Sequence, residues 1–176
     1  MYKLRNEGKI RLIGQSAYSN EDFQKLIPKV KPDVIQSWAN AMETPFVEEG
    51  SPTRKLMEEN RISFVAFRPL GQGLLLDKYH KDNPPKFEDG DHRKGLERFS
   101  LESLAGLEPK LTKLKEKFGS STEDLARMSL QYLLHHKFMG AVIPGFRNLK
   151  QVKVNLSAMD NPLTDDEFGF IKNVFA

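Results

Sequence analysis

Four short apolar runs, each followed by a helical pattern, limit the possible folds of this chain most strongly. The runs are rich in β-branched or aromatic residues and read IRLIG at 10–14, DVIQSW at 33–38, ISFVAF at 62–67 and GAVIP at 140–144. Strands that alternate with helices predict a parallel sheet with right-handed crossovers. Because the runs show little polar alternation, both faces of the sheet are expected to be covered, as in barrels and doubly wound sheets. The sequence therefore predicts an α/β fold.

Capping residues mark where helices are expected to begin. Ser19, Ser51 and Thr164 each precede a stretch with helical character, and a hydroxyl at such a position can accept a free backbone N–H. Between the third and fourth runs, the spacing of leucines predicts a helix over 107–118, and a Ser/Thr start predicts another over 121–134.

Residues 70–100 differ from the rest because they show no clear period and contain many turn-forming residues. A loop of this length inside a compact domain is usually either functional or disordered, and the sequence leaves both alternatives open. The Pro84-Pro85 pair is where mobility is expected most.

Composition narrows the class of protein. The chain has 176 residues, 39% hydrophobic and 29% charged, which predicts a single globular domain. It contains no Cys, which excludes disulfides and catalytic or metal-binding thiolates. No apolar stretch approaches the roughly 18 residues of a membrane span, and the polar start does not resemble a signal peptide, so a cytoplasmic protein without a membrane partner is expected. The net charge is only +3, with basic residues scattered among acidic ones, so no nucleic-acid partner is expected.

The segment VIPGFRNLKQVKVN at 142–155 suggests a binding site for an anionic small molecule. Its apolar start suits a buried strand, Pro144-Gly145 ends that strand, and a helical stretch with Arg147, Lys150 and Lys153 follows. Free N–H groups at a helix start, next to positive charge, suit a phosphate group. A turn followed by solvated lysines is the alternative interpretation.

Four segments together resemble the C-terminal half of an aldo-keto reductase. GKIRLIGQSAYS resembles the family's GKIRxIGVSNFS, VIQSWAN its VVQxxYN, VAFRPLGQGLLLDKY its IAYSPLGxGLLTGKY, and IPGFRNLKQVKVN its IPGxxxxxQLxEN. The resemblance implies that residues 1–176 form one half of a (β/α)8 barrel, with strands five to eight and a long loop at 70–100. It also implies NADP(H) as cofactor, bound at the C-terminal ends of the strands.

The resemblance implies a set of cofactor-binding residues. Four of them match contacts to the adenosine and its 2′-phosphate: Gly145, Arg147, Gln151 and Asn155. Pro69, Leu70, Gly71 and Gly73 match the loop around the pyrophosphate, and Ser16 and Gln36 match residues that hold the carboxamide. Phe67 matches the aromatic residue that stacks on the nicotinamide, and Arg68 either contacts a phosphate or is solvated.

Several positions depart from the family pattern. Phe67 replaces the usual tyrosine, which keeps the aromatic face, and Arg68 replaces a serine. Ala17 stands where the family has asparagine, which removes one expected carboxamide contact. Val154 replaces the glutamate that recognises the adenine amino group.

The family's catalytic Asp, Tyr, Lys and His come from the first half of the barrel, and no position here matches them. No catalytic or metal-binding residue is therefore assigned, and the chain alone is expected to be inactive. LRNEGK resembles the end of the family's fourth helix. Because half a barrel would leave IRLIG and GAVIP as edge strands with unpaired N–H and C=O groups, we expect pairing either with a second copy or with a separate N-terminal half.

Other candidates for chemistry have simpler explanations. Tyr18 is expected to pack or lie on the surface, while Tyr79, His80 and His92 either touch ligand or are solvated loop residues. His135-His136 is explained by positive charge at the C-terminal end of a helix.

Three functions stay open. The first is NADPH-dependent reduction of a carbonyl substrate, with this chain as the cofactor-binding half. The second is a non-catalytic nucleotide-binding or scaffolding module, and the third is a half-barrel that binds no nucleotide.

Overall fold

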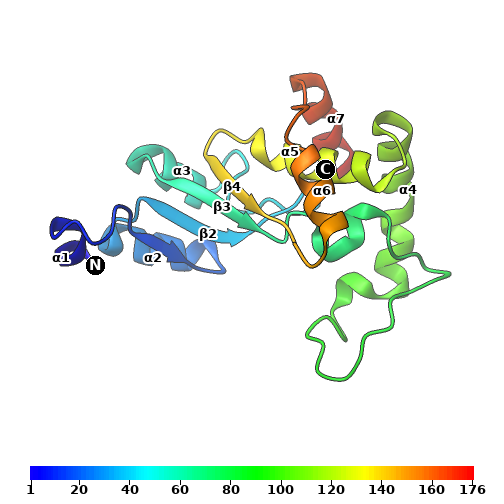
Figure 1. Ribbon diagram of the computed structural model, residues 1–176, viewed down its shortest axis with the longest axis horizontal. Helices are drawn as coiled ribbons and strands as arrows, with labels where there is room; N and C mark the ends of the chain where they lie inside the picture. Colours follow the sequence, from blue (N-terminus) through cyan, green and yellow to red (C-terminus); the bar gives the residue numbers. More distant parts are fainter.

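A computed structural model describes all residues, 1–176, and contains one parallel sheet. Its strands are β1 (Gly14–Ser16), β2 (Val34–Trp38), β3 (Ser63–Phe67) and β4 (Met139–Ile143), in the spatial order β1-β2-β3-β4 (Figure 1). The predicted α/β class with four parallel strands is confirmed.

The first strand lies later than expected. The run at 10–14 contributes only its last residue to β1, because Ile13 is held by Asp33 instead of by a ladder partner. The Ile13 N–H donates to the Asp33 carboxylate at 2.8 Å, and the Asp33 N–H donates to the Ile13 carbonyl at 2.8 Å.

Seven α-helices and two 3-10 helices connect the strands. The α-helices are α1 (Tyr2–Asn6), α2 (Asn20–Val30), α3 (Pro52–Asn60), α4 (Leu101–Phe118), α5 (Thr122–Leu134), α6 (Leu149–Ser157) and α7 (Asp165–Phe175). The 3-10 helices are η1 (Gly71–Leu76) and η2 (Glu97–Phe99). Helix α4 begins six residues before the predicted start, because Ser100 caps it by accepting the Ser103 N–H.

The helices cover only one face of the sheet. On that face Ile35, Ser37, Phe64 and Ala66 are fully buried, and the three apolar ones belong to a core cluster of 21 residues. The alternate positions of every strand are half-buried or exposed. The expectation that both faces are covered is therefore wrong for this chain, because the apolar residues of the second face have nothing packed over them.

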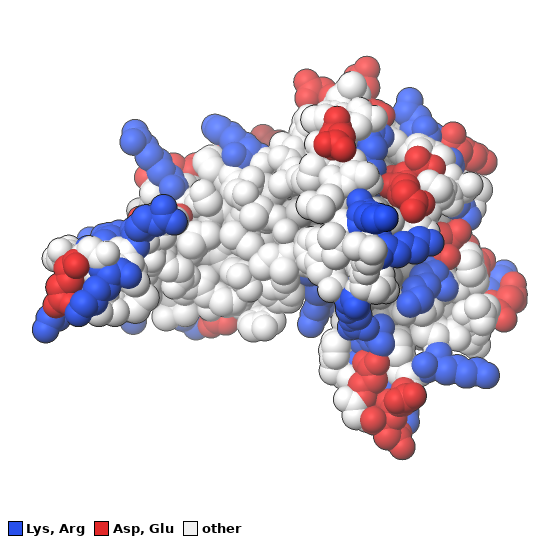
Figure 2. Space-filling model, viewed as in Figure 1, with Lys and Arg blue, Asp and Glu red and all other residues white.

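The register of the strands aligns the side chains of this open face in rows across the sheet. One row across the sheet is Ser16, Gln36, Val65 and Ala141, and the next is Trp38, Phe67 and Ile143. Figure 2 shows a broad area without charged side chains over these strands. Beyond β1 and β4 the sheet has no further strand, so both are edge strands.

The long loop after η1 packs on its own aromatic side chains. The rings of Tyr79, Phe87 and Phe99 lie 5.0 to 6.3 Å apart in edge contacts, and the Arg93 guanidinium lies 4.4 Å from the Phe87 ring centre. Phe99 joins Leu74 in a small cluster of buried residues. In Figure 1 this loop extends away from the sheet below α4.

The pair His135-His136 requires a correction. Burial, with a smaller effect of nearby Arg54, lowers the pKa of His136 to about 4, so this side chain is neutral near pH 7. Only His135 lies near an acid, with its Nε2 3.0 Å from the Asp165 carboxylate. The expected positive charge at the end of α5 is therefore wrong for His136.

None of the helices in this fold combines the length and apolar character needed to cross a lipid bilayer.

Candidate functional site

The turn between β3 and η1 has an unusual backbone. Arg68, Gly71, Gln72 and Gly73 all have positive φ, at 59°, 56°, 58° and 103°. Two short bonds close the turn, from the Gly71 N–H to the Arg68 carbonyl and from the Gly73 N–H to the Leu70 carbonyl, both at 3.0 Å. The turn consequently folds back on itself and presents backbone at the C-terminal end of β3.

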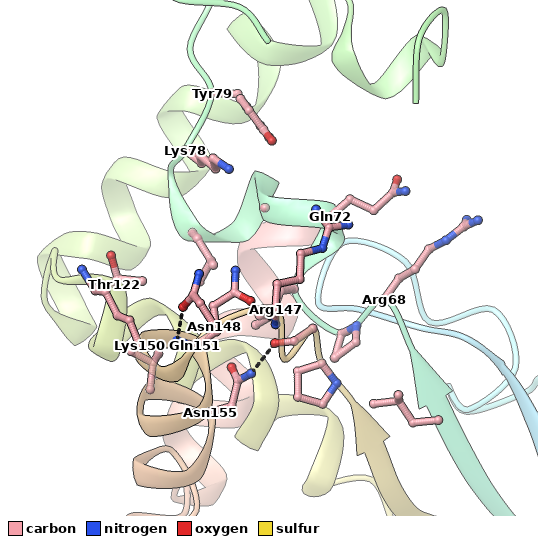
Figure 3. Close-up of a pocket in the computed structure, with 18 of the residues that line it drawn as sticks. Arg68, Gln72, Lys78, Tyr79, Thr122, Arg147, Asn148, Lys150, Gln151 and Asn155 are labelled. Atoms are coloured by element: carbon pink, nitrogen blue, oxygen red, sulfur yellow. Dashed lines mark hydrogen bonds between the residues drawn. The ribbon is translucent and has the colours of Figure 1, made fainter. Parts of the chain in front are cut away.

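The turn between β4 and α6 is held by three polar side chains. Asn148 caps α6 by accepting the Gln151 N–H at 2.9 Å, and Gln151 in return accepts the Arg147 N–H at 2.7 Å. Asn155 donates to the Gly145 carbonyl at 2.9 Å (Figure 3). Gln151 and Asn155, which the family resemblance assigned to the cofactor, therefore shape the turn directly.

Both turns open into one cavity of about 680 Å³. The segment after η1, the long loop and the start of α5 also line this cavity. The lining residues that do not belong to either turn include Lys78, Tyr79, His92, Arg93 and Thr122. The turns after two neighbouring strands thus face the same space, as Figure 3 shows.

The cavity is rich in positive charge without acidic partners. Arg68, Lys78, Arg147 and Lys150 line it, and none of them forms an ion pair. The first N–H groups of α6 lie at the same place, and a helix start carries partial positive charge. This combination favours a ligand with several negative charges.

Asp77 and Arg93 also line the cavity, and each is paired with an oppositely charged residue behind the wall. Asp77 binds Lys115 at 2.6 Å, and Asp91 binds Arg93 at 2.6 Å with a second bond to its Nε. The Arg93 side chain holds the pKa of Asp91 well below its usual range, and Asp91 raises the pKa of Arg93. This second pair stays ionised and fixes the loop beside the cavity.

Eight of the twelve predicted cofactor residues line this cavity. They are Arg68, Pro69, Leu70, Gly73, Gly145, Arg147, Gln151 and Asn155. Gly145 has open space around its Cα, since a Cβ there would meet no atom within 4 Å. Whether these residues contact a cofactor stays a prediction.

The other four predicted residues lie outside the cavity. Gly71 packs against Met42, while Ser16, Gln36 and Phe67 lie on the open face of the sheet. The Ser16 hydroxyl donates to the Gln36 carbonyl at 3.0 Å. Phe67 has the Arg68 guanidinium 5.5 Å from its ring centre.

The two other departures from the family pattern are both buried. Ala17 belongs to the core on the helical side, so its side chain does not lie beside Ser16 and Gln36. Val154 is buried in the wall of the cavity, on the first turns of α6.

Sequence reasoning missed part of the wall. For Tyr79 and His92 the sequence leaves two alternatives, contact with a ligand or a solvated loop. Both residues line the cavity, and the His92 ring nitrogen lies 3.0 Å from the Gln72 amide. Lys78 lies within the segment VAFRPLGQGLLLDKY, which resembles the family motif, and could have been found from that position. Thr122, the first residue of α5, also lines the cavity, and no pattern in the sequence points to it.

Comparisons with known proteins agree on one family. The sequence profile of the Aldo/keto reductase family matches residues 1–175. An aldo-keto reductase of Strobilurus tenacellus is 26% identical over 178 residues, which is 99% of this chain and 51% of that protein. The L-glyceraldehyde 3-phosphate reductase of Escherichia coli is 28% identical over 88% of this chain and 46% of its own length.

Solved structures agree with the observed fold. The glycerol dehydrogenase of Gluconobacter oxydans superposes with a TM-score of 0.78 at 26% identity, over 99% of this chain and 51% of that protein. The chain thus spans about half the length of the relatives that it matches.

Proposed function

The chain belongs to the aldo/keto reductase family, and on this premise we propose that it is the NADPH-binding half of a barrel that reduces carbonyl compounds. The observation that carries this proposal is the convergence of two strand-end turns on one cavity with four unpaired basic side chains.

The cavity suits the phosphate groups of NADPH. Its volume lies within the range of cofactor sites, which is roughly 300 to 1,000 Å³. Gly145 leaves room for close approach of a phosphate to the backbone, and the start of α6 offers free N–H groups. Arg147 would bind the 2′-phosphate, because its planar guanidinium can donate to two phosphate oxygens at once.

The nicotinamide end would lie on the open face of the sheet. Phe67 ends β3 on that face, directly before the turn that lines the cavity. Ser16 and Gln36 are opposite each other on neighbouring strands of the same face, so their polar groups can hold one carboxamide. When bound, NADPH supplies the hydride, and these side chains orient its ring.

The proton donor would come from outside this chain. Reduction of a carbonyl needs a general acid and stabilisation of the developing alkoxide, which the family provides with Tyr, Lys, Asp and His. We propose that an N-terminal half-barrel provides them and that this chain alone does not turn over carbonyl substrates.

NADPH binding is testable through Trp38, the only tryptophan. Trp38 pairs with Phe67 across β2 and β3, so a nicotinamide ring beside Phe67 should quench its fluorescence. We expect saturable quenching by NADPH, and a dissociation constant about 10 to 100 times larger in Arg147→Ala, from the loss of a charge-assisted pair of hydrogen bonds. NADH, which lacks the 2′-phosphate, should bind both proteins equally.

Arg11→Ala is the matched control, because Arg11 is exposed, forms no ion pair and lies on the other edge of the sheet. Equal loss of affinity in both variants, or no NADPH binding at all, would contradict the proposed cofactor site.

A second candidate is a nucleotide-binding module without catalysis. The burial of Ala17 in the core favours it, because the side chain at this position cannot reach the carboxamide from the open face. Tight NADPH binding with no carbonyl reduction, even after a complementing N-terminal half is supplied, would select this second function.

A further inference from the structure

A second cavity, of about 260 Å³, lies next to η1 and is separate from the basic cavity. It is lined by Leu74 of η1, whereas Gln72, Gly73 and Leu76 of the same helix line the basic cavity. No residue lines both cavities. A ligand in the second cavity would therefore bind to side chains that the proposed cofactor site does not use.

The apolar part of this second cavity comes from segments that are distant in the sequence. Met42 lies in the loop between β2 and α3, Leu107 lies on α4 and Phe175 ends α7, and all three are half-buried. Met42 and Leu107 pack against a small cluster that includes the buried Leu74. Because part of their apolar surface stays uncovered, the cavity suits the apolar body of a small ligand.

The backbone on two sides of this cavity is fixed by hydrogen bonds. Asn40 and Glu43 exchange two backbone hydrogen bonds at 3.0 Å, and the Met42 N–H donates to the Asn40 side-chain oxygen at 3.0 Å. On the α4 side, the Ser103 N–H donates to the Ser100 hydroxyl at 3.1 Å. The cavity is therefore formed before a ligand binds, which lowers the entropy lost on binding.

The charged residues of this cavity leave one cation without a partner. Its lining contains Arg98, Lys110 and Glu43, and two cations against one acid give a net charge of one. Arg98 is paired with Glu43 at 3.4 Å. Lys110 is half-buried, forms no ion pair, and has its ammonium group 5.6 Å from the centre of the Phe175 ring. A ligand with one negative charge would balance Lys110, at a place where partial burial weakens screening by water.

We propose that this second cavity binds a small monocarboxylate with a short apolar chain or ring. The carboxylate pairs with the Lys110 ammonium, and the apolar body lies on Met42, Leu107 and Phe175. The volume is just below the roughly 300 Å³ at which sites for drug-sized ligands begin, so the ligand is a smaller molecule. This site goes beyond the proposed function, and its test involves neither NADPH nor carbonyl reduction.

Hexanoate is the probe, and the backbone amide signals of the ¹⁵N-labelled chain in NMR spectra are the readout. We expect saturable shifts at Gly106 and Lys110 with a dissociation constant of about 1 mM. Hexylammonium, which has the same chain and the opposite charge, should bind at least about tenfold more weakly. Acetate, which lacks the apolar chain, should also bind at least about tenfold more weakly. The Arg147 amide reports separately on carboxylate binding in the basic cavity.

Two pairs of variants on α4 test the charge and the space separately. Lys110→Met keeps the aliphatic stem and should raise the dissociation constant of hexanoate at least about tenfold, whereas Lys113→Met, at an exposed position outside the cavity, should not change it. Gly106→Leu should abolish binding, because Gly106 lines the cavity and an added Cβ meets no atom within 4 Å. Ala105→Leu, at the exposed neighbouring position, should bind like the wild type. Leucine is favoured in helices, and thermal unfolding checks that all four variants fold.

Three results would overturn the proposal. Hexanoate shifts confined to Arg147 and its neighbours would place the carboxylate in the basic cavity only. Equal affinity for hexanoate and hexylammonium, or for the Lys110→Met and Lys113→Met variants, would show that Lys110 does not select the ligand. Unchanged hexanoate affinity in Gly106→Leu would show that the ligand does not occupy this cavity. Absence of NADPH binding would instead count against the proposed cofactor site alone.

Discussion

Individual residues of the cavity wall act in two different ways. Arg68, Lys78, Arg147 and Lys150 keep their charge available, since none has an acidic partner. Gln151 and Asn155 instead form hydrogen bonds to the backbone of the turn that carries Arg147. Ligand affinity at this site therefore depends both on residues that face the cavity and on amides that fix the backbone behind it.

His136 makes stability depend on pH. Its folded-state pKa of about 4 lies below the ordinary value near 6.5, so between these values the unfolded chain takes up a proton that the folded chain does not. Stability should consequently fall as the pH drops below about 6.5, by up to about 2 kcal/mol at pH 5. Its Nε2 is also buried without a hydrogen-bond partner.

Urea unfolding at pH 7 and pH 5 measures this effect. His136→Phe keeps an aromatic ring against Tyr132 and Phe168 and removes the titration, so it should lose less stability between the two pH values than the wild type. His92→Phe, at an exposed position, should behave like the wild type. Identical pH dependence in all three proteins would exclude His136 as the cause.

Residue types at the turns were predictable, but their partners were not. The cations after β4 could be chosen from sequence because phosphate binding favours positive charge near a helix start, whereas the glycines of both turns and Arg68 came from the family resemblance. The neutral state of His136 could not, since it follows from burial against α7, which the local sequence does not reveal.

At the scale of elements, the β3 turn depends on Gly71. Its φ of 56° disfavours a side chain, and an added Cβ would come 2.6 Å from Met42 Cε. Gly71→Ala should therefore destabilise the fold by at least about 1 kcal/mol and weaken NADPH binding by displacing the turn. Thermal unfolding and the Trp38 titration measure the two effects.

Gly106→Ala is the matched control for this turn. Gly106 lies inside α4 with no atom near an added Cβ, so alanine should stabilise the chain by about 0.5 to 1 kcal/mol. A stabilising Gly71→Ala would mean that the observed turn is not the conformation in solution.

Elements with local signals were predicted well. Ser19, Ser121 and Thr164 cap the helices expected of them, since a cap and the N–H it accepts are three residues apart. The conformation of the loop after η1 could not be predicted, because it depends on the ring contact between Tyr79 and Phe99, which are twenty residues apart in the sequence. The short β1 likewise depends on Asp33, which is distant in sequence.

For the whole molecule, the decisive property is a sheet covered on one side. A continuous apolar run predicts a strand buried on both faces, and this inference fails here because no element of the chain packs over the second face of the sheet. The apolar runs therefore predicted the positions of the strands correctly, but the prediction that both faces of these strands are buried was wrong. The open face is also where Phe67 and the predicted carboxamide residues Ser16 and Gln36 lie.

Two alanines on opposite faces of neighbouring strands test this one-sided architecture. Ala66 on β3 is fully buried under the helices, whereas Ala141 on β4 is exposed on the open face. Ala66→Lys should cost about 3 kcal/mol or more, because it buries an unpaired charge. Ala141→Lys should change the stability of the isolated chain by no more than about 0.5 kcal/mol, since the ammonium group reaches water. Urea unfolding of both variants measures these costs, and a large cost for Ala141→Lys would mean that this face is already covered by a partner.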